Sequence, residues 1–215
     1  MAERISRALL PDNTSVADDG MATFGGVRTD DLVTQFGTPL FVYDEDHIRK
    51  RCQEAVKAFP DGVSYASKAF LCKAIAKLVH EEGMGLDVAT IGEAYIALQS
   101  GVPASDLTLH GNNKSMEELR YAADNGIGKV VIDSFDEIDK IEHLYATTRK
   151  PIKALVRVTP GVEAYTHKYV TTGQVDSKFG FTVQNGQAGN AIERAKSSGA
   201  IDLIGLHDHI GSQIF

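Results

Sequence analysis

The sequence predicts an α/β protein built from parallel βαβ units. Short apolar runs that are typical of β-strands alternate along the chain with longer runs that are typical of helices. No low-complexity linker interrupts this alternation. Strands that alternate with helices of this length are joined by crossover connections, and such connections produce a parallel sheet covered by helices.

The expected elements follow one another in a regular order. The expected strands are Leu40–Tyr43, Val63–Ala66, Leu86–Val88, Leu107–His110, Lys129–Ile132, Ala154–Val158 and Leu203–His207. The expected helices are Asp44–Phe59, Ala69–Glu82, Ile91–Ser100, Ser115–Asn125, Phe135–Thr147 and Ala188–Ser198. Ser115 precedes Glu118 by three positions, which is the spacing of a capping box at a helix start. Gly101, Gly126 and Gly199 stand where helices are expected to end.

The number of expected strands falls short of a closed barrel. Without the run Leu40–Tyr43, six inner strands remain, whereas an eight-stranded α/β barrel typically needs about 250 residues. The last residues follow a strand without another helix. If the fold is a barrel, we expect this 215-residue chain to be an N-terminal fragment of it.

Composition excludes several classes of function. The 22 basic and 29 acidic residues give a net charge of -7, so we expect no nucleic-acid partner, which would require a basic stripe. No apolar run approaches the roughly 20 residues that span a bilayer, and the N-terminus does not resemble a signal peptide. Cys52 and Cys72 form neither a metal spacing nor a disulfide framework, so a reducing, cytoplasmic setting is expected.

Lys68 is the first candidate site residue. It stands where the expected strand Val63–Ala66 ends and a helical run begins. Barrels of the α/β type place their active sites at the C-terminal ends of their strands. An amine that is partly desolvated there is able to form a Schiff base with a carbonyl compound. Taken alone, an ordinary solvated lysine remains the alternative.

Three further polar positions lie at expected strands. Asp87 is either a capping residue ahead of Thr90 or a site residue. The loop 110–115, which begins with His110, is either a site loop or a turn followed by a helix cap. Arg157 lies within an apolar strand, where a charge needs a carboxylate or the barrel mouth, and we favour a functional role for it.

Two histidines near the end of the sequence allow three interpretations. His207 and His209 lie on one face of a strand, as in a Zn or Fe site, for which His110 or Asp87 would supply further ligands. Alternatively, His209 stacks on a ring while Gly211–Ser212 contact a phosphate. In the third interpretation, the motif is a strand end with a satisfied histidine. The residues alone leave all three open.

Eight segments between residues 38 and 215 form a recognisable set: Tyr65–Cys72, Leu86–Thr90, His110–Ser115, Val131–Ser134, Leu155–Val158, Thr159–Ala164, Ser177–Gly180 and Gly205–Gln213. In order and approximate spacing, these segments resemble those of diaminopimelate decarboxylases. That family belongs to the fold-type-III, alanine-racemase-like pyridoxal-phosphate enzymes, or group IV decarboxylases. One such segment alone would be weak evidence, but the set in register is strong.

The resemblance implies a fold and a domain division. It implies a (β/α)8 TIM barrel of the alanine-racemase type, of which about six of eight strands lie in this chain. Residues 1–37 would be an N-terminal extension and residues 38–215 a partial pyridoxal-phosphate-binding barrel domain. A glycine-rich phosphate loop, a glutamate that pairs with the pyridine nitrogen and a C-terminal β domain would lie outside the chain.

The resemblance also implies roles for five residues. Lys68 would be catalytic and would hold pyridoxal 5'-phosphate covalently, while His209 would be catalytic and stack on the cofactor ring. Ser212 would contact the cofactor phosphate. Asp87 and Arg157 would bind the cofactor near the Schiff base and ring. No metal is implied.

The implied activity is pyridoxal-phosphate-dependent decarboxylation of meso-2,6-diaminopimelate to L-lysine and CO2, the last step of lysine biosynthesis. The full-length enzyme would be a cytoplasmic homodimer with shared active sites, acting on a small amino acid without nucleic acid or membrane, and the 215-residue chain alone would be inactive. The alternatives are an ornithine- or arginine-type decarboxylase of the same fold, a metal-dependent barrel hydrolase using His207 and His209, and a cofactor-binding protein without catalysis.

Overall fold

The computed structural model describes residue 6, residues 9–161 and residues 178–209. The chain forms two compact units, one of residues 1–63 with 81–84 and one of residues 64–80 with 85–215. These units are defined by spatial contacts. The sequence predicts a different division, with an extension of residues 1–37 and a barrel domain of residues 38–215. That division stays a prediction.

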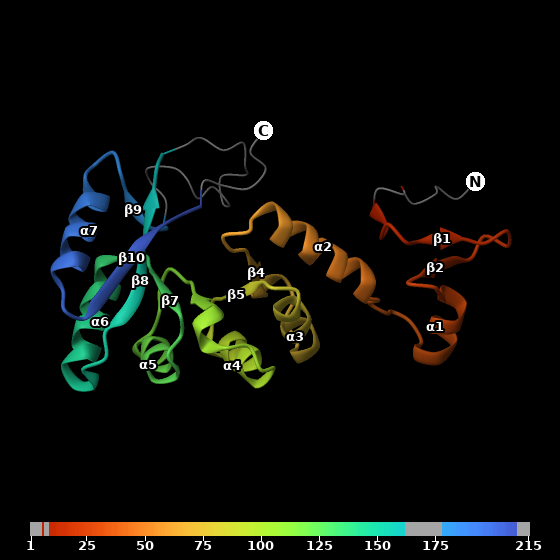
Figure 1. Ribbon diagram of the computed structural model, residues 1–215, viewed down its shortest axis with the longest axis horizontal. Coiled ribbons are helices and arrows are strands. Elements are labelled where there is room, and N and C mark those ends of the chain that lie inside the picture. The colour runs from red at the N-terminus through yellow and green to blue at the C-terminus, as the bar shows by residue number, and fades with distance from the viewer. Residues whose placement is uncertain (1–5, 7–8, 162–177, 210–215) are drawn as a thin grey trace. The chain divides into compact units, whose positions relative to one another are not determined.

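The first unit begins with a small antiparallel sheet (Figure 1). Its strands are β1 (Ser15–Val16), β2 (Ala22–Phe24) and β3 (Val27–Arg28), paired in the order β1-β2-β3. Two helices follow, α1 (Thr29–Phe36) and α2 (Glu45–Ala58). The sheet and α1 are absent from the sequence prediction, because strands of two or three residues are too short to show a period.

The prediction of a strand at Leu40–Tyr43 is wrong. This run has no regular structure, and its side chains are exposed, with Phe41 at 87%. An apolar run becomes a strand only when its backbone groups find a partner, and none of the described strands pairs with this run. Helix α2 begins immediately after it, where the Asp44 carboxylate accepts a hydrogen bond from the His47 backbone N–H at 3.0 Å.

The second unit contains a parallel sheet whose strands lie side by side in sequence order, β4-β5-β6-β7-β8-β10. The strands are β4 (Ser64–Ala66), β5 (Gly85–Val88), β6 (Leu107–Leu109), β7 (Lys129–Ile132), β8 (Ile152–Thr159) and β10 (Ile201–Asp208). A short strand that the sequence did not predict, β9 (Phe181–Thr182), pairs with the last two residues of β8. Sequence-order winding is that of a (β/α)8 barrel, so the predicted incomplete barrel of six inner strands is confirmed.

Helices α3 to α7 lie on one side of this row of strands (Figure 1). They are α3 (Lys73–Glu81), α4 (Ile91–Gln99), α5 (Met116–Asn125), α6 (Phe135–Thr148) and α7 (Gln187–Ser197), with the 3-10 turns η2 (Ser67–Ala69) and η3 (Ala104–Asp106). The predicted capping box is present, since Ser115 and Glu118 satisfy each other's backbone N–H groups. Among the described residues, no helix has the length and apolarity needed to cross a membrane.

The core lies between the strands and these helices. The fully buried residues include Leu86, Leu107 and Ile132 on strands and Leu119 and Ile138 on helices. Each such side chain contributes about 1.5–3 kcal/mol through removal of apolar surface from water. The packed outer face holds the strands in register, and the register in turn places the residues at the strand ends.

Candidate active site

Polar side chains gather where the parallel strands end. Parallel strands point the same way, so residues that follow their carboxyl ends share one rim of the sheet. This strand-end rim comprises Lys68, Asp87, His110, Asp133, Arg157, His207 and His209. Four of the five predicted site residues are in this set. The fifth, Ser212, lies outside the described residues.

Lys68 lies in the 3-10 turn η2, directly after β4. Its side chain is exposed, so the partial desolvation considered from the sequence is not present among the described residues. The neighbouring Ser67 is buried, and its hydroxyl has no hydrogen-bond partner in the described part of the chain. Lys68 is therefore accessible to a ligand that approaches the rim.

Asp87, His110 and His207 form a connected row across three strands. The Asp87 carboxylate lies 3.5 Å from His110 Nε2. The His110 ring meets the His207 ring edge to face, with ring centres 4.9 Å apart and planes at 74°. Thr90, not Asp87, caps the following helix by accepting from the Glu93 backbone N–H. The alternative in which Asp87 caps this helix is therefore wrong, and Asp87 lies on the rim beside His110.

His207 is held in its neutral form. Burial lowers its pKa to about 4, and the nearby His110 and Arg157 side chains act in the same direction. Its Nδ1 atom is buried, and no hydrogen-bond partner for it exists among the described residues. A buried polar atom without a partner is costly, so this nitrogen marks a place where a bound group would be stabilised.

Arg157 is anchored at the end of β8 by contacts that the sequence did not reveal. Its Nη1 lies 3.3 Å from Asp133 Oδ1, and the two side chains are 11% and 3% exposed. The guanidinium lies over the Phe179 ring, 4.5 Å from its centre. The other oxygen of Asp133 accepts from the Gly180 backbone N–H at 3.0 Å. The arginine is thus a fixed positive charge with a defined orientation.

Asp133 is the residue that sequence reasoning missed as a site member. It follows the apolar strand β7 in the same way that Asp87 follows Leu86, so its position at a strand end was the available signal. The sequence predicts that Arg157 faces a carboxylate or the barrel mouth, but it does not indicate which carboxylate. The partner lies 24 residues earlier in the chain.

His209 follows β10 and is influenced by the same charges. Partial burial lowers its pKa, and the positive charges of Arg157 and Lys68 lower it further. Lys68 and Arg157 therefore contribute to the electrostatic environment of His209. Along β10, His207 lies on the less exposed face, whereas Asp208 lies on the exposed one.

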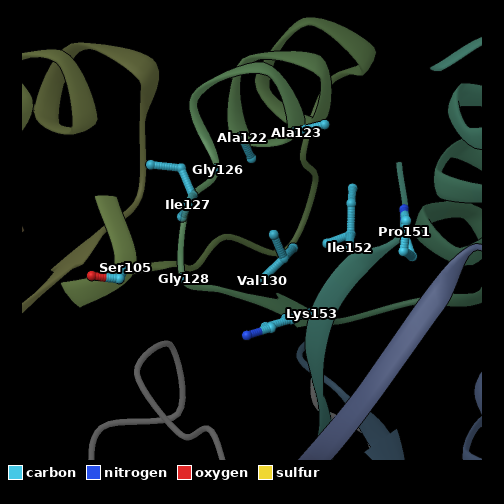
Figure 2. Close-up of a pocket in the computed structure, with 10 residues that line it drawn as sticks. All are labelled: Ser105, Ala122, Ala123, Gly126, Ile127, Gly128, Val130, Pro151, Ile152 and Lys153. Atoms are coloured by element: carbon cyan, nitrogen blue, oxygen red, sulfur yellow. The ribbon is translucent and has the colours of Figure 1, made fainter. Parts of the chain in front are cut away.

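No group of three or more His, Cys, Asp or Glu is arranged to hold a metal ion within the described ranges. A hollow of about 220 Å³ does occur elsewhere in the second unit (Figure 2). It is lined by the end of α5, the start of β7 and the start of β8, including Gly126, Val130 and Ile152. It therefore lies at the amino ends of the strands, opposite the strand-end rim, and is not part of the candidate site.

Comparison with known proteins places the chain among enzymes of one cofactor class. Residues 45–215 match the sequence model described as pyridoxal-dependent decarboxylase, pyridoxal binding domain. Diaminopimelate decarboxylase of Bacillus subtilis (strain 168) is 50% identical over 201 residues, which are 91% of this chain and 46% of that protein. The chain spans about half the length of the curated relatives it matches.

Solved structures agree with the sequence matches. Diaminopimelate decarboxylase from M. jannaschii in complex with L-lysine superimposes with a TM-score of 0.84 at 32% identity, covering 95% of this chain and 49% of that one. Lysine/ornithine decarboxylase from Vibrio vulnificus complexed with putrescine gives a TM-score of 0.68 at 29% identity, covering 86% and 45%.

Proposed function

Because this chain belongs to the pyridoxal-dependent decarboxylases through their pyridoxal-binding domain, we propose that the complete protein decarboxylates meso-2,6-diaminopimelate to L-lysine and CO2. The observation that carries the proposal is the similarity to diaminopimelate decarboxylases over more than nine-tenths of the chain. The reaction would be the last step of lysine biosynthesis.

The residues of the strand-end rim fit pyridoxal 5'-phosphate. An accessible amine, an anchored guanidinium and imidazoles suit a cofactor that carries an aldehyde, an aromatic ring and a phosphate. The buried, unpartnered atoms Ser67 Oγ and His207 Nδ1 mark places on the rim where a bound group would find hydrogen-bonding partners. These two observations support the fit independently of the family match.

Individual roles follow from chemistry and position. Lys68 would bind the cofactor covalently, and His209 would stack on its ring. Arg157, oriented by Asp133, and Asp87, beside His110, would lie near the ring and the attached nitrogen. Ser212 would contact the phosphate. When bound, the cofactor supplies an electron sink for the pair left behind when CO2 departs.

We also infer that the complete protein is a cytoplasmic homodimer whose active sites are shared, and that residues 1–37 and 38–215 are its extension and barrel domain. The resemblance of the segments at the strand ends supports these inferences, and the two free cysteines fit the reducing setting of the cytoplasm. Sedimentation of the complete protein measures its mass directly, and a monomer with full activity would contradict the shared sites.

An ornithine- or arginine-type decarboxylase of the same fold is the second candidate. The similarity to the lysine/ornithine decarboxylase of Vibrio vulnificus keeps it in consideration, but its TM-score and identity are below those of the M. jannaschii enzyme. The metal-dependent hydrolase built on His207 and His209 has no support from the family match.

One set of assays separates these functions. The complete protein is reduced with borohydride. The mass of the peptide that contains Lys68 is then measured by mass spectrometry to detect an attached phosphopyridoxyl group. Release of CO2 is then measured from meso-diaminopimelate, ornithine, arginine and lysine. We expect release from meso-diaminopimelate in preference to the others. A cofactor-loaded protein that prefers ornithine would support the second candidate, and a bound metal lost together with activity on chelation would support the hydrolase.

A further inference from the structure

The loop between β6 and α5 contains a buried lysine that the proposed function leaves without a role. Lys114 and Glu137 are 1% and 0% exposed, and Lys114 Nζ lies 2.9 Å from Glu137 Oε2. Lys114 belongs to the loop 110–115, and Glu137 lies in the first turn of α6. Neither side chain reaches the surface, so neither contacts a ligand at the rim directly.

Each hydrogen-bonding group of the pair has a partner. The Lys114 ammonium also donates to the carbonyl oxygens of Gly111 at 2.6 Å and Val131 at 2.5 Å, which uses all three of its N–H groups. Glu137 Oε1 accepts from the Lys114 backbone N–H at 3.2 Å, and Oε2 accepts from the Asp133 backbone N–H at 2.9 Å. The pair therefore joins the backbone of two loops.

These two loops carry residues of the candidate site at their ends. The loop 110–115 begins with His110, which contacts Asp87 and the His207 ring. The turn after β7 contains Asp133, which orients Arg157 and accepts from Gly180. A displacement of either loop would move a rim contact, although the buried pair lies behind the rim.

We propose that Lys114 and Glu137 are positioning residues, which lock the β6–α5 loop to the β7–α6 turn and thereby set the orientation of His110 and Arg157 toward the cofactor. The inference rests on the proposed function. Burial of a charged pair offers little net stability compared with well-packed apolar residues. The Lys114–Glu137 pair instead fixes geometry, because its five hydrogen bonds hold both loops in one arrangement.

The test uses the complete protein loaded with pyridoxal 5'-phosphate and the double variant Lys114→Met/Glu137→Met. Two methionines fill a similar volume without leaving an unpaired charge, so we expect a folded protein by circular dichroism. We expect kcat to fall by about 100-fold, as for a small misplacement of reacting groups, while KM changes little. The circular dichroism of the bound cofactor should also change.

A matched control lies on the same helix. Glu142 on α6 pairs with Arg194 on α7 at 2.7 Å, so Glu142→Gln perturbs α6 at a contact that involves neither loop. We expect this variant to keep the kcat and the cofactor spectrum of the parent. A folded double variant with parental kcat and spectrum would reduce the pair to a structural role and overturn the proposal.

Two further measurements keep the test decisive. If the double variant does not fold, Glu137→Gln is assayed instead, since its amide keeps one acceptor oxygen and the volume of the side chain. A folded Glu137→Gln with parental kcat contradicts the proposal. Hydrogen exchange of the cofactor-free variant should accelerate in residues 110–115 and 131–135 but not in β5. Exchange does not depend on decarboxylase activity, so failure of the proposed function is distinguished from failure of the positioning role.

Discussion

At the strand-end rim, we propose that the chemistry depends on Lys68. It lies in η2 directly after β4, and its side chain is exposed. A primary amine in this place is available to a carbonyl compound, whereas the anchored guanidinium of Arg157 is not a nucleophile. We therefore propose different tasks for the two groups, covalent attachment for the amine and charge placement for the guanidinium.

Replacement of Lys68 tests covalent attachment. We expect Lys68→Ala in the complete protein to lose the reducible cofactor bond and to lower turnover by about 1,000-fold or more, because the group that accepts and releases the cofactor is gone. Mass spectrometry after borohydride reduction and CO2 release are the measurements. Lys73→Ala, an exposed lysine at the start of α3, is the control and should behave as the parent. Near-normal turnover of Lys68→Ala would refute the assignment.

His207 gives the stability of the fold a pH dependence of known sign. Its pKa is about 4 in the folded chain against 6.5 for the free side chain, chiefly through burial, with Asp87 opposing the effect of His110, Arg157 and His209. Between these values the unfolded chain binds more protons. Stability is therefore lost as the pH falls from about 6.5 to about 4.

The magnitude is on the order of 2 kcal/mol after allowance for partial exposure of the ring. We expect His207→Gln to flatten the decline in melting temperature across this pH range in the complete protein. His143→Gln, at an exposed position on α6, is the control with the same substitution. An unchanged slope in His207→Gln would show that other groups cause the acid sensitivity.

At the scale of elements, the short strand β9 holds the end of β8 in place. Gly180 precedes β9 with φ at +69°, and a Cβ atom there would lie 2.9 Å from the Arg157 carbonyl oxygen. Thr159 donates from its hydroxyl to the Phe179 carbonyl at 2.7 Å. Glycine is required because the backbone of this segment passes against Arg157 itself.

Gly180→Ala and Gly186→Ala form a matched pair. Both glycines have a positive φ, but a Cβ at Gly186 would meet nothing within 4 Å. We expect Gly186→Ala to cost about 1 kcal/mol of stability through backbone strain alone. Gly180→Ala should cost about 1–3 kcal/mol more through the clash, and should weaken cofactor binding because Arg157 moves. Equal losses, measured by denaturant unfolding and cofactor titration, would contradict a role for this close approach.

At the scale of the whole molecule, the main row of parallel strands in the described residues ends at β4 on one side and at β10 on the other. On β10, Ile204 and Leu206 are 48% and 54% exposed. Unpaired edges and exposed apolar side chains favour association with other chains. The curated relatives that this chain matches are about twice as long as the chain.

We therefore expect residues 1–215, expressed alone, to be poorly soluble and to release no CO2 from meso-diaminopimelate. Each charge-assisted hydrogen bond to the cofactor that is missing costs about 1.5–3 kcal/mol, so cofactor affinity should fall by orders of magnitude. Solubility, visible absorbance with added cofactor and CO2 release are compared with those of the complete protein. A soluble 215-residue chain with measurable turnover would show that the site is complete within it.

The sequence by itself determined the α/β class, the six inner strands, the main helices and the capping box at Ser115, because periodicity and capping are local properties of the chain. It also determined that Lys68, Asp87, Arg157 and His209 come at strand ends, since parallel strands bring such positions to one rim. Only the tertiary structure decided that Leu40–Tyr43 is not a strand, that Asp133 holds Arg157 and that burial keeps His207 neutral. These features depend on contacts between residues far apart in the sequence, and no local pattern encodes which distant group will be the partner.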